Sequence, residues 1–161
     1  MAFRRSIFRW LVRLSRFGLA GLFLFTAGAK VAIAKTFVAN VGELLGASGI
    51  DLDWAWPATV VVIAAELVIA IMLLVRPTVR LGALGAAALL MGFAAYALYY
   101  VYILHGEPLE CGCFGGIIAS QLGVKTALRN LALLIPVVLV LIGYARPKLE
   151  DAGQVTKPAV A

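Results

Sequence analysis

Residues 58–104 read ATVVVIAAELVIAIMLLVRPTVRLGALGAAALLMGFAAYALYYVYIL, with two long apolar segments on either side of one short polar stretch. The segments Ala58–Val75 and Leu81–Leu104 each approach the roughly 20 residues that a helix needs to cross a hydrocarbon core of about 30 Å. Only Arg76-Pro77-Thr78-Val79-Arg80 lies between them, and proline blocks the continuation of a helix. The stretch therefore predicts two antiparallel membrane-spanning helices joined by a tight turn.

Two further apolar segments, 17–34 and 127–145, have similar lengths and flank this hairpin. The whole chain is 63% hydrophobic and 14% charged, with a mean hydropathy of +1.02, whereas soluble domains are about half apolar and about a quarter charged. We therefore expect an all-α membrane protein, an antiparallel bundle of four transmembrane helices. It comprises a basic N-terminal segment (1–16), a membrane domain (17–146) and a polar tail (147–161) that is expected to be disordered.

The distribution of basic residues predicts how the bundle is oriented. Cytoplasmic loops of membrane proteins carry an excess of lysine and arginine. One side of the predicted topology has ten basic residues, namely Arg4, Arg5, Arg9, Arg13, Arg16, Arg76, Arg80, Arg146, Lys148 and Lys157, and the other has Lys35, Lys125 and Arg129. Both termini are thus expected in the cytoplasm, with the protein in the cytoplasmic (inner) membrane and the lipid bilayer as its main partner. The net charge of +6 follows the segment ends rather than one polar face, so no nucleic-acid partner is expected.

The N-terminal segment has two interpretations. Arg5, Arg9, Arg13 and Arg16 recur at helical spacing, which is typical of a helix lying on an anionic membrane surface; the alternative is a plain basic flank of the first span. A competing account treats the first span as a cleaved signal peptide ending near Ala27-Gly28-Ala29. After this span, the first part of the loop 36–57 is expected to form a short helix over the bundle.

Small residues along two spans predict close helix packing, because glycines let backbones approach one another. They are Gly18, Gly21 and Gly28 in the first span, and Gly82, Gly85 and Gly92 in the third.

The third inter-helical loop contains the only two cysteines, in the sequence HGEPLECGCFGG at 105–116. The Cα atoms of Cys111 and Cys113 would lie about 7 Å apart in an extended chain, beyond the usual disulfide range of about 4.4–6.8 Å. Gly112 supplies the turn that a disulfide would need, and a small strained ring is easily reduced. Outside the cytoplasm disulfides persist, so the pair is a candidate exchange site.

Two alternatives for the cysteines stay open. One is a static local disulfide or two inert thiols, although a short ring restrains little unfolded-state entropy. The other is a metal site with His105. Because no fourth ligand is evident, copper(I) would be the candidate metal for such a site. Of these alternatives, we predict that the cysteines bind no metal.

Three ionisable residues, Lys30, Glu66 and Arg129, interrupt the apolar segments. Charges inside a membrane are costly and by default mark a paired or functional site. Lys30 lies about 7 Å and Glu66 about 12 Å from the outer ends of their helices, so we predict that they pair, with Arg129 at a similar level near the cysteine loop. Nearby cations would lower a cysteine pKa, and Glu110 would oppose this. The alternative is that Lys30 and Arg129 extend outwards to the interface.

Tyrosines crowd the outer end of the third span, and an interfacial aromatic belt accounts for them. A second interpretation is that Tyr96, with Tyr99 or Tyr100 on the same helical face, lines a pocket for a flat ligand such as a quinone. Quinone is therefore a candidate cofactor, and none is certain.

The chain resembles the methylamine utilisation protein MauE family, within the wider DoxX-like group of four-helix membrane proteins. The resemblance covers about 17–146 and rests on Cys111-Gly112-Cys113-Phe114-Gly115, Gly28 with Lys30, Glu66, and Arg129-Asn130. It implies a membrane component that works beside an extracytoplasmic thioredoxin-like protein in making or maintaining disulfides of an exported protein. In the case that names the family, this client is the small subunit of methylamine dehydrogenase.

The functional hypothesis is thus a thiol–disulfide oxidoreductase in which Cys111 and Cys113 cycle between dithiol and disulfide. Because the chain has no other cysteine to relay electrons from the cytoplasm, the electron acceptor would be quinone or a soluble oxidant. A non-enzymatic scaffold or docking factor is the main alternative. A small-solute transporter or a metal-binding protein is less favoured, since no discontinuous span or internal repeat is evident.

Overall fold

The computed structural model describes residues 2–104 and 123–145, and this part of the chain is built from helices without strands. Its helices include four that are long and apolar enough to cross a membrane: Ser6–Ala32, Leu52–Leu74, Arg76–Tyr102 and Val124–Tyr144. The prediction of an all-helical, multi-pass membrane protein is confirmed. The structure contains no membrane, so the cytoplasmic placement of the termini stays a prediction.

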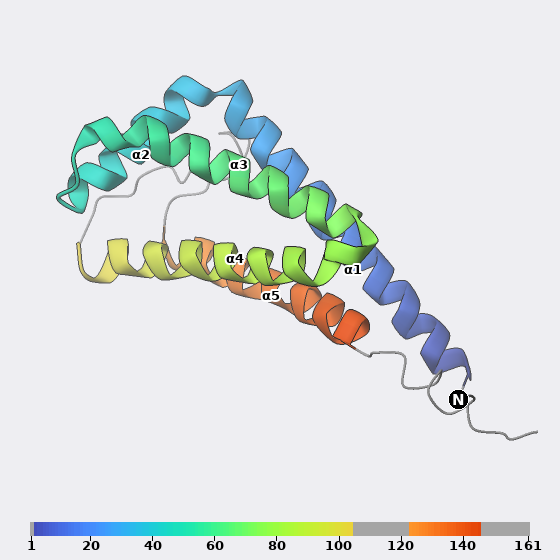
Figure 1. The fold of residues 1–161 in the computed structure, drawn as a ribbon. Helices are drawn as coiled ribbons and strands as arrows, with labels where there is room; N and C mark the ends of the chain where they lie inside the picture. The colour runs from blue at the N-terminus through green and yellow to red at the C-terminus, as the bar shows by residue number, and fades with distance from the viewer. Residues whose placement is uncertain (1, 105–122, 146–161) are drawn as a thin grey trace, which may run out of the picture.

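Helix α1 (Ala2–Ala32) is one continuous helix of 31 residues, about 46 Å long at 1.5 Å per residue. It passes the expected boundary at 16–17 without a break, so residues 2–16 continue the axis of the first span, and its N-terminal part extends beyond the other helices (Figure 1). The side chains of Val12, Leu19, Phe23 and Ala27 are buried in the core. Helix α1 is therefore an integral part of the bundle.

The remaining elements follow in the order α2 (Ala34–Ala47), the 3-10 turn η1 (Leu52–Trp54), α3 (Ala55–Leu74), the 3-10 turn η2 (Arg76–Thr78), α4 (Val79–Tyr102) and α5 (Val124–Ala145). One end of the bundle contains the first turns of α1, the whole of η2 and the end of α5 (Figure 1). The other end contains α2, η1 and the start of α5. Helix α1 contacts α3 and α5, and α4 contacts the same two helices. The four spans therefore form a closed ring with α3 and α5 on one diagonal.

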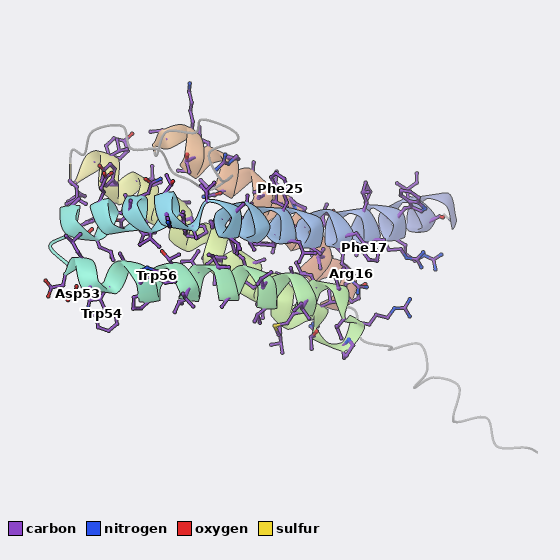
Figure 2. The ribbon with its side chains drawn as sticks, turned by 90° about the horizontal axis from the view of Figure 1, so that it is seen from above. Arg16, Phe17, Phe25, Asp53, Trp54 and Trp56 are labelled. Carbon is purple, nitrogen blue, oxygen red and sulfur yellow. The ribbon has the colours of Figure 1, made fainter. Side chains whose placement is uncertain are left out.

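The segment between the first two spans contains the expected short helix, α2, which packs on α3. After it, Trp54 and Trp56 have exposed fractions of 62% and 63% and project from the side of the bundle (Figure 2). Exposed tryptophans near a helix end are typical of residues at the membrane–water interface.

Helices α3 and α4 pack closely where Gly82 faces the end of α3. A Cβ atom at Gly82 would lie 2.9 Å from the backbone nitrogen of Leu73, and one at Gly85 would lie 3.1 Å from the side chain of Ile69. Close packing is thus confirmed for these two positions. The prediction of close packing is wrong for Gly18, Gly21, Gly28 and Gly92, where a Cβ atom would meet nothing within 4 Å.

Gly143 of α5, which is not one of these six glycines, lies close to Val12 of α1. A Cβ atom at Gly143 would lie 2.6 Å from both methyl groups of Val12.

The last residues of α3 are held by Arg16 of α1 (Figure 2). Arg16 is only 5% exposed, and its guanidinium donates hydrogen bonds to the carbonyl oxygens of Leu73 and Leu74 and, at 2.9 Å, to the Tyr144 hydroxyl. The last carbonyls of a helix have no partner within that helix. Arg16 therefore caps α3 and joins three helices at this end of the bundle.

Candidate functional site

An ion pair between Lys30 of α1 and Glu66 of α3 lies inside the bundle. Both residues are 2% exposed, and the Lys30 ammonium donates a hydrogen bond to Oε1 of Glu66. The predicted pairing is confirmed, and the alternative in which Lys30 extends to the interface is wrong. The ammonium also lies 5.6 Å from the ring centre of Phe37 and 6.0 Å from that of Phe93, distances at which aromatic faces attract cations.

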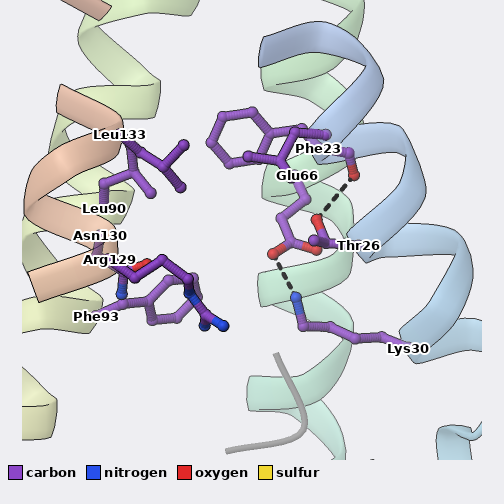
Figure 3. A pocket seen from close by; sticks show the side chains of 10 residues that line it. Phe23, Thr26, Lys30, Glu66, Leu90, Phe93, Arg129, Asn130 and Leu133 are labelled. Carbon is purple, nitrogen blue, oxygen red and sulfur yellow. Dashed lines mark hydrogen bonds and ion pairs between the residues drawn. The ribbon is translucent and has the colours of Figure 1, made fainter. Parts of the chain in front are cut away.

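Helix α5 supplies the opposite wall of this site through Arg129 and Asn130. Arg129 is half-buried, and its side chain extends from α5 toward the ion pair, as Figure 3 shows. Between the two walls is a cavity of about 40 Å³, lined by Leu22, Phe23, Thr26, Lys30, Glu66, Leu90, Phe93, Arg129, Asn130 and Leu133. The expectation that Arg129 lies at the level of the ion pair is thus met.

Several polar atoms at this cavity lack a complete set of hydrogen bonds. Among the residues that the structure describes, Oε2 of Glu66 and Nδ2 of Asn130 are buried and have no hydrogen-bond partner. Thr26 donates its hydroxyl hydrogen to the Phe23 carbonyl at 3.1 Å, and the hydroxyl lies beside the Glu66 carboxylate (Figure 3). The site thus presents an unused acceptor on α3 and an unused donor on α5.

The methylamine utilisation protein MauE family matches residues 8–143, which is most of the chain. The chain belongs to the MauE family. No curated protein and no solved structure matches it significantly. Membership supports a membrane protein associated with methylamine utilisation, and the matched region contains the whole polar cavity as well as the cysteine loop.

The predicted catalytic residues of this MauE-family chain, Cys111 and Cys113, lie outside the described residues, as do Gly112, Phe114, Gly115 and His105. Their disulfide, its exchange and the alternative metal site stay predictions. In the described part of the chain, no group of three potential metal ligands comes together. The structure does place the two stems of the cysteine loop side by side, because α4 and α5 pack against each other and a Cβ atom at Gly123 would lie 4.0 Å from a methyl group of Val101.

The three tyrosines proposed to contact a quinone have different surroundings. The Tyr96 hydroxyl donates to the Leu44 carbonyl at 2.8 Å and lies 3.1 Å from Oγ of Ser48, so it ties α4 to the end of α2. Tyr99 is 44% exposed, with its ring centre 6.3 Å from that of Tyr96, whereas Tyr100 is 3% exposed. A quinone contact at these residues stays a prediction.

Phe23 and Thr26 of the cavity wall, unlike Lys30, are not among the residues predicted for the site. Phe23, Thr26 and Lys30 recur at intervals of three and four, which places them on one face of α1. Phe93 and Leu90 of α4 are apolar residues among many others, so only the fold distinguishes them.

Proposed function

We propose that this protein is a redox-associated membrane protein that uses Cys111 and Cys113 for thiol–disulfide exchange with an extracytoplasmic thioredoxin-like partner. A partner thiolate attacks one sulfur of the Cys111–Cys113 disulfide, and the other sulfur leaves as a thiolate. The second partner thiol then attacks the mixed disulfide, so that the partner becomes a disulfide and the pair becomes a dithiol. Quinone or a soluble oxidant takes the two electrons that restore the disulfide.

One observation carries this proposal: the only cysteines of the chain form a Cys-Gly-Cys unit in the connection between α4 and α5. That connection leaves the end of α4 that lies opposite η2; the exposed Arg76 of η2 and the exposed Arg80 in the first turn of α4 lie at that opposite end. If the basic end is cytoplasmic, as the excess of basic residues predicts, the cysteines lie in the compartment where disulfides persist.

The position of the polar cavity along α5 is consistent with this proposal. Arg129 lies six residues after Gly123, or about 9 Å along the helix from the loop stem. We propose that Lys30 and Arg129 favour the thiolate form of a nearby cysteine, because cations lower the pKa of a thiol. Cys111 and Cys113 alkylation against pH in Arg129→Ala tests this role, and an unchanged profile would exclude it.

Trapping experiments in cells test the exchange itself. In Cys111→Ser and Cys113→Ser, we expect one of the two variants to accumulate a mixed disulfide with a thioredoxin-like protein, because its resolving cysteine is missing. The adduct should disappear with reductant and should be absent from the double Cys→Ser variant. Absence of any adduct from both single variants, at normal protein levels, would contradict the proposal.

A scaffold function is the second candidate, and α2 favours it. This helix lies outside the four spans and is held at the cysteine-loop end by the hydrogen bond from Tyr96 to Leu44. It would offer a docking surface for a partner or its client. Full maturation of the client by the double Cys→Ser variant would establish the scaffold and eliminate the redox function. For the client we propose an exported protein, with methylamine dehydrogenase as the first to test in view of the family.

A further inference from the structure

We propose that the cavity at the Lys30–Glu66 ion pair binds a small cluster of ordered water molecules that joins α3 to α5 across the inside of the bundle. The ligand is defined by two buried groups of opposite hydrogen-bonding character. Oε2 of Glu66 needs a donor and Nδ2 of Asn130 needs an acceptor, and both atoms lack a partner among the described residues. Water supplies both functions in one small molecule.

The size of the site agrees with this ligand. A water molecule needs a cavity of about 10–15 Å³ by the same measure, so 40 Å³ accommodates about three or four. Drug-sized ligands occupy pockets of roughly 300–1,000 Å³, which excludes a large organic molecule from this space as it stands. An apolar occupant is excluded by the residues themselves, since Glu66 and Asn130 are 2% and 5% exposed and would stay without partners.

The position of the cavity gives the water cluster a structural role. Helices α3 and α5 occupy one diagonal of the ring and make no backbone contact with each other. Glu66 belongs to α3 and Asn130 to α5 (Figure 3), so a bridge between their side chains connects the two helices directly. Buried waters usually make about three hydrogen bonds, and the Thr26 hydroxyl beside the carboxylate provides a further partner.

The charged groups that face the cavity keep it hydrated. Lys30 comes from α1, Glu66 from α3 and Arg129 from α5, whereas α4 contributes the apolar side chains of Leu90 and Phe93. Ionised groups in a low-dielectric interior gain strongly from any polar contact. The cluster therefore solvates the ion pair in a part of the protein that is otherwise surrounded by lipid.

Hydroxyl-radical footprinting of the full chain in lipid nanodiscs tests the proposal, because radicals produced by X-ray radiolysis of bound water label the side chains next to it. Leu90 lines the cavity and is 4% exposed, whereas Leu73 is 0% exposed and lies in the core away from it. We expect Leu90 to be labelled at least several-fold faster than Leu73. Equal rates for the two leucines in the unmodified protein would overturn the proposal.

Two variants assign the water to the named groups. Asn130→Leu removes the donor at similar volume and should reduce labelling of Leu90 toward the rate of Leu73. Thr59→Val is the matched control, because Thr59 is a buried polar residue of α3 that does not line the cavity, and it should leave labelling unchanged. If Asn130→Leu does not fold, Asn130→Val, which also lacks a hydrogen-bonding side chain, serves instead. A folded apolar variant of Asn130 with labelling like that of the unmodified protein would overturn the bridge.

Discussion

Replacement of Lys30 by methionine removes one member of the buried ion pair and leaves the Glu66 carboxyl group buried without its partner. Both residues are 2% exposed, so bulk solvent cannot replace the lost interaction. Removing one partner of a buried pair costs about 3–5 kcal/mol. We therefore expect Lys30→Met to lower the free energy of unfolding by about this amount, which changes the folding equilibrium constant by roughly two to three and a half powers of ten.

The assay is equilibrium unfolding by SDS in mixed micelles, followed by far-UV circular dichroism. The double variant Lys30→Met/Glu66→Gln should recover part of the loss, because an uncharged amide costs less to bury than an unpaired carboxylate. Lys35→Met is the matched control: Lys35 is an exposed residue of α2, and surface substitutions usually change stability by less than about 0.5 kcal/mol.

Three results would refute this reasoning. A change in Lys30→Met no larger than that in Lys35→Met would mean that the pair does not stabilise the bundle. A double variant less stable than Lys30→Met would mean that the free carboxylate is not the cause of the loss. A strong dependence of the loss on ionic strength would place the pair in contact with solvent, since buried pairs are screened little by salt.

Further substitutions test the other contacts by the same unfolding measurement. Gly143→Ala should lower the free energy of unfolding by about 1–3 kcal/mol through overpacking against Val12. The free energy of unfolding should recover when Val12 is also replaced by alanine. Gly92→Ala is the control, because a Cβ atom at Gly92 would meet nothing within 4 Å. Arg16→Lys should lower the free energy of unfolding by roughly 1–3 kcal/mol, because an ammonium cannot reproduce the guanidinium fork. A loss equal to that of Arg13→Lys would contradict the role of Arg16 as the cap of α3. Tyr96→Phe should lower the free energy of unfolding by about 0.5–1.5 kcal/mol and increase hydrogen exchange at the end of α2. Unchanged hydrogen exchange would mean that the Tyr96 hydroxyl does not hold α2 in place.

The pairing of Lys30 with Glu66 was predictable because depth along a helix follows directly from residue number. Each residue interrupts an apolar span at a countable distance from its outer end, and a charge in lipid needs a partner. The orientation of α5 was predictable only in part: Arg129 lies at the expected level, but the cavity that it shares with Asn130 depends on the helical faces of all four spans.

Other contacts had no local signal. Arg16 belongs to a regular series of arginines, and nothing in that series distinguishes the one that is buried from Arg9 and Arg13, which are exposed. Among the glycines, Gly82 faces a neighbouring backbone whereas Gly21 faces outwards, although both lie in similar small-residue stripes. Gly143 belongs to no series of small residues in the sequence, and a Cβ atom there would lie 2.6 Å from the methyl groups of Val12.

The sequence by itself determined the number of spans, the hairpin between α3 and α4 and the depths of Lys30 and Glu66 along their helices. These properties depend on the length and spacing of residues within one helix. Only the tertiary structure decided which charges cap, pair or line the cavity, because those contacts depend on the rotation of each helix about its axis. Packing against two neighbours sets that rotation: it turns Arg16 onto the end of α3 and brings Glu66 and Asn130 to opposite walls of one cavity.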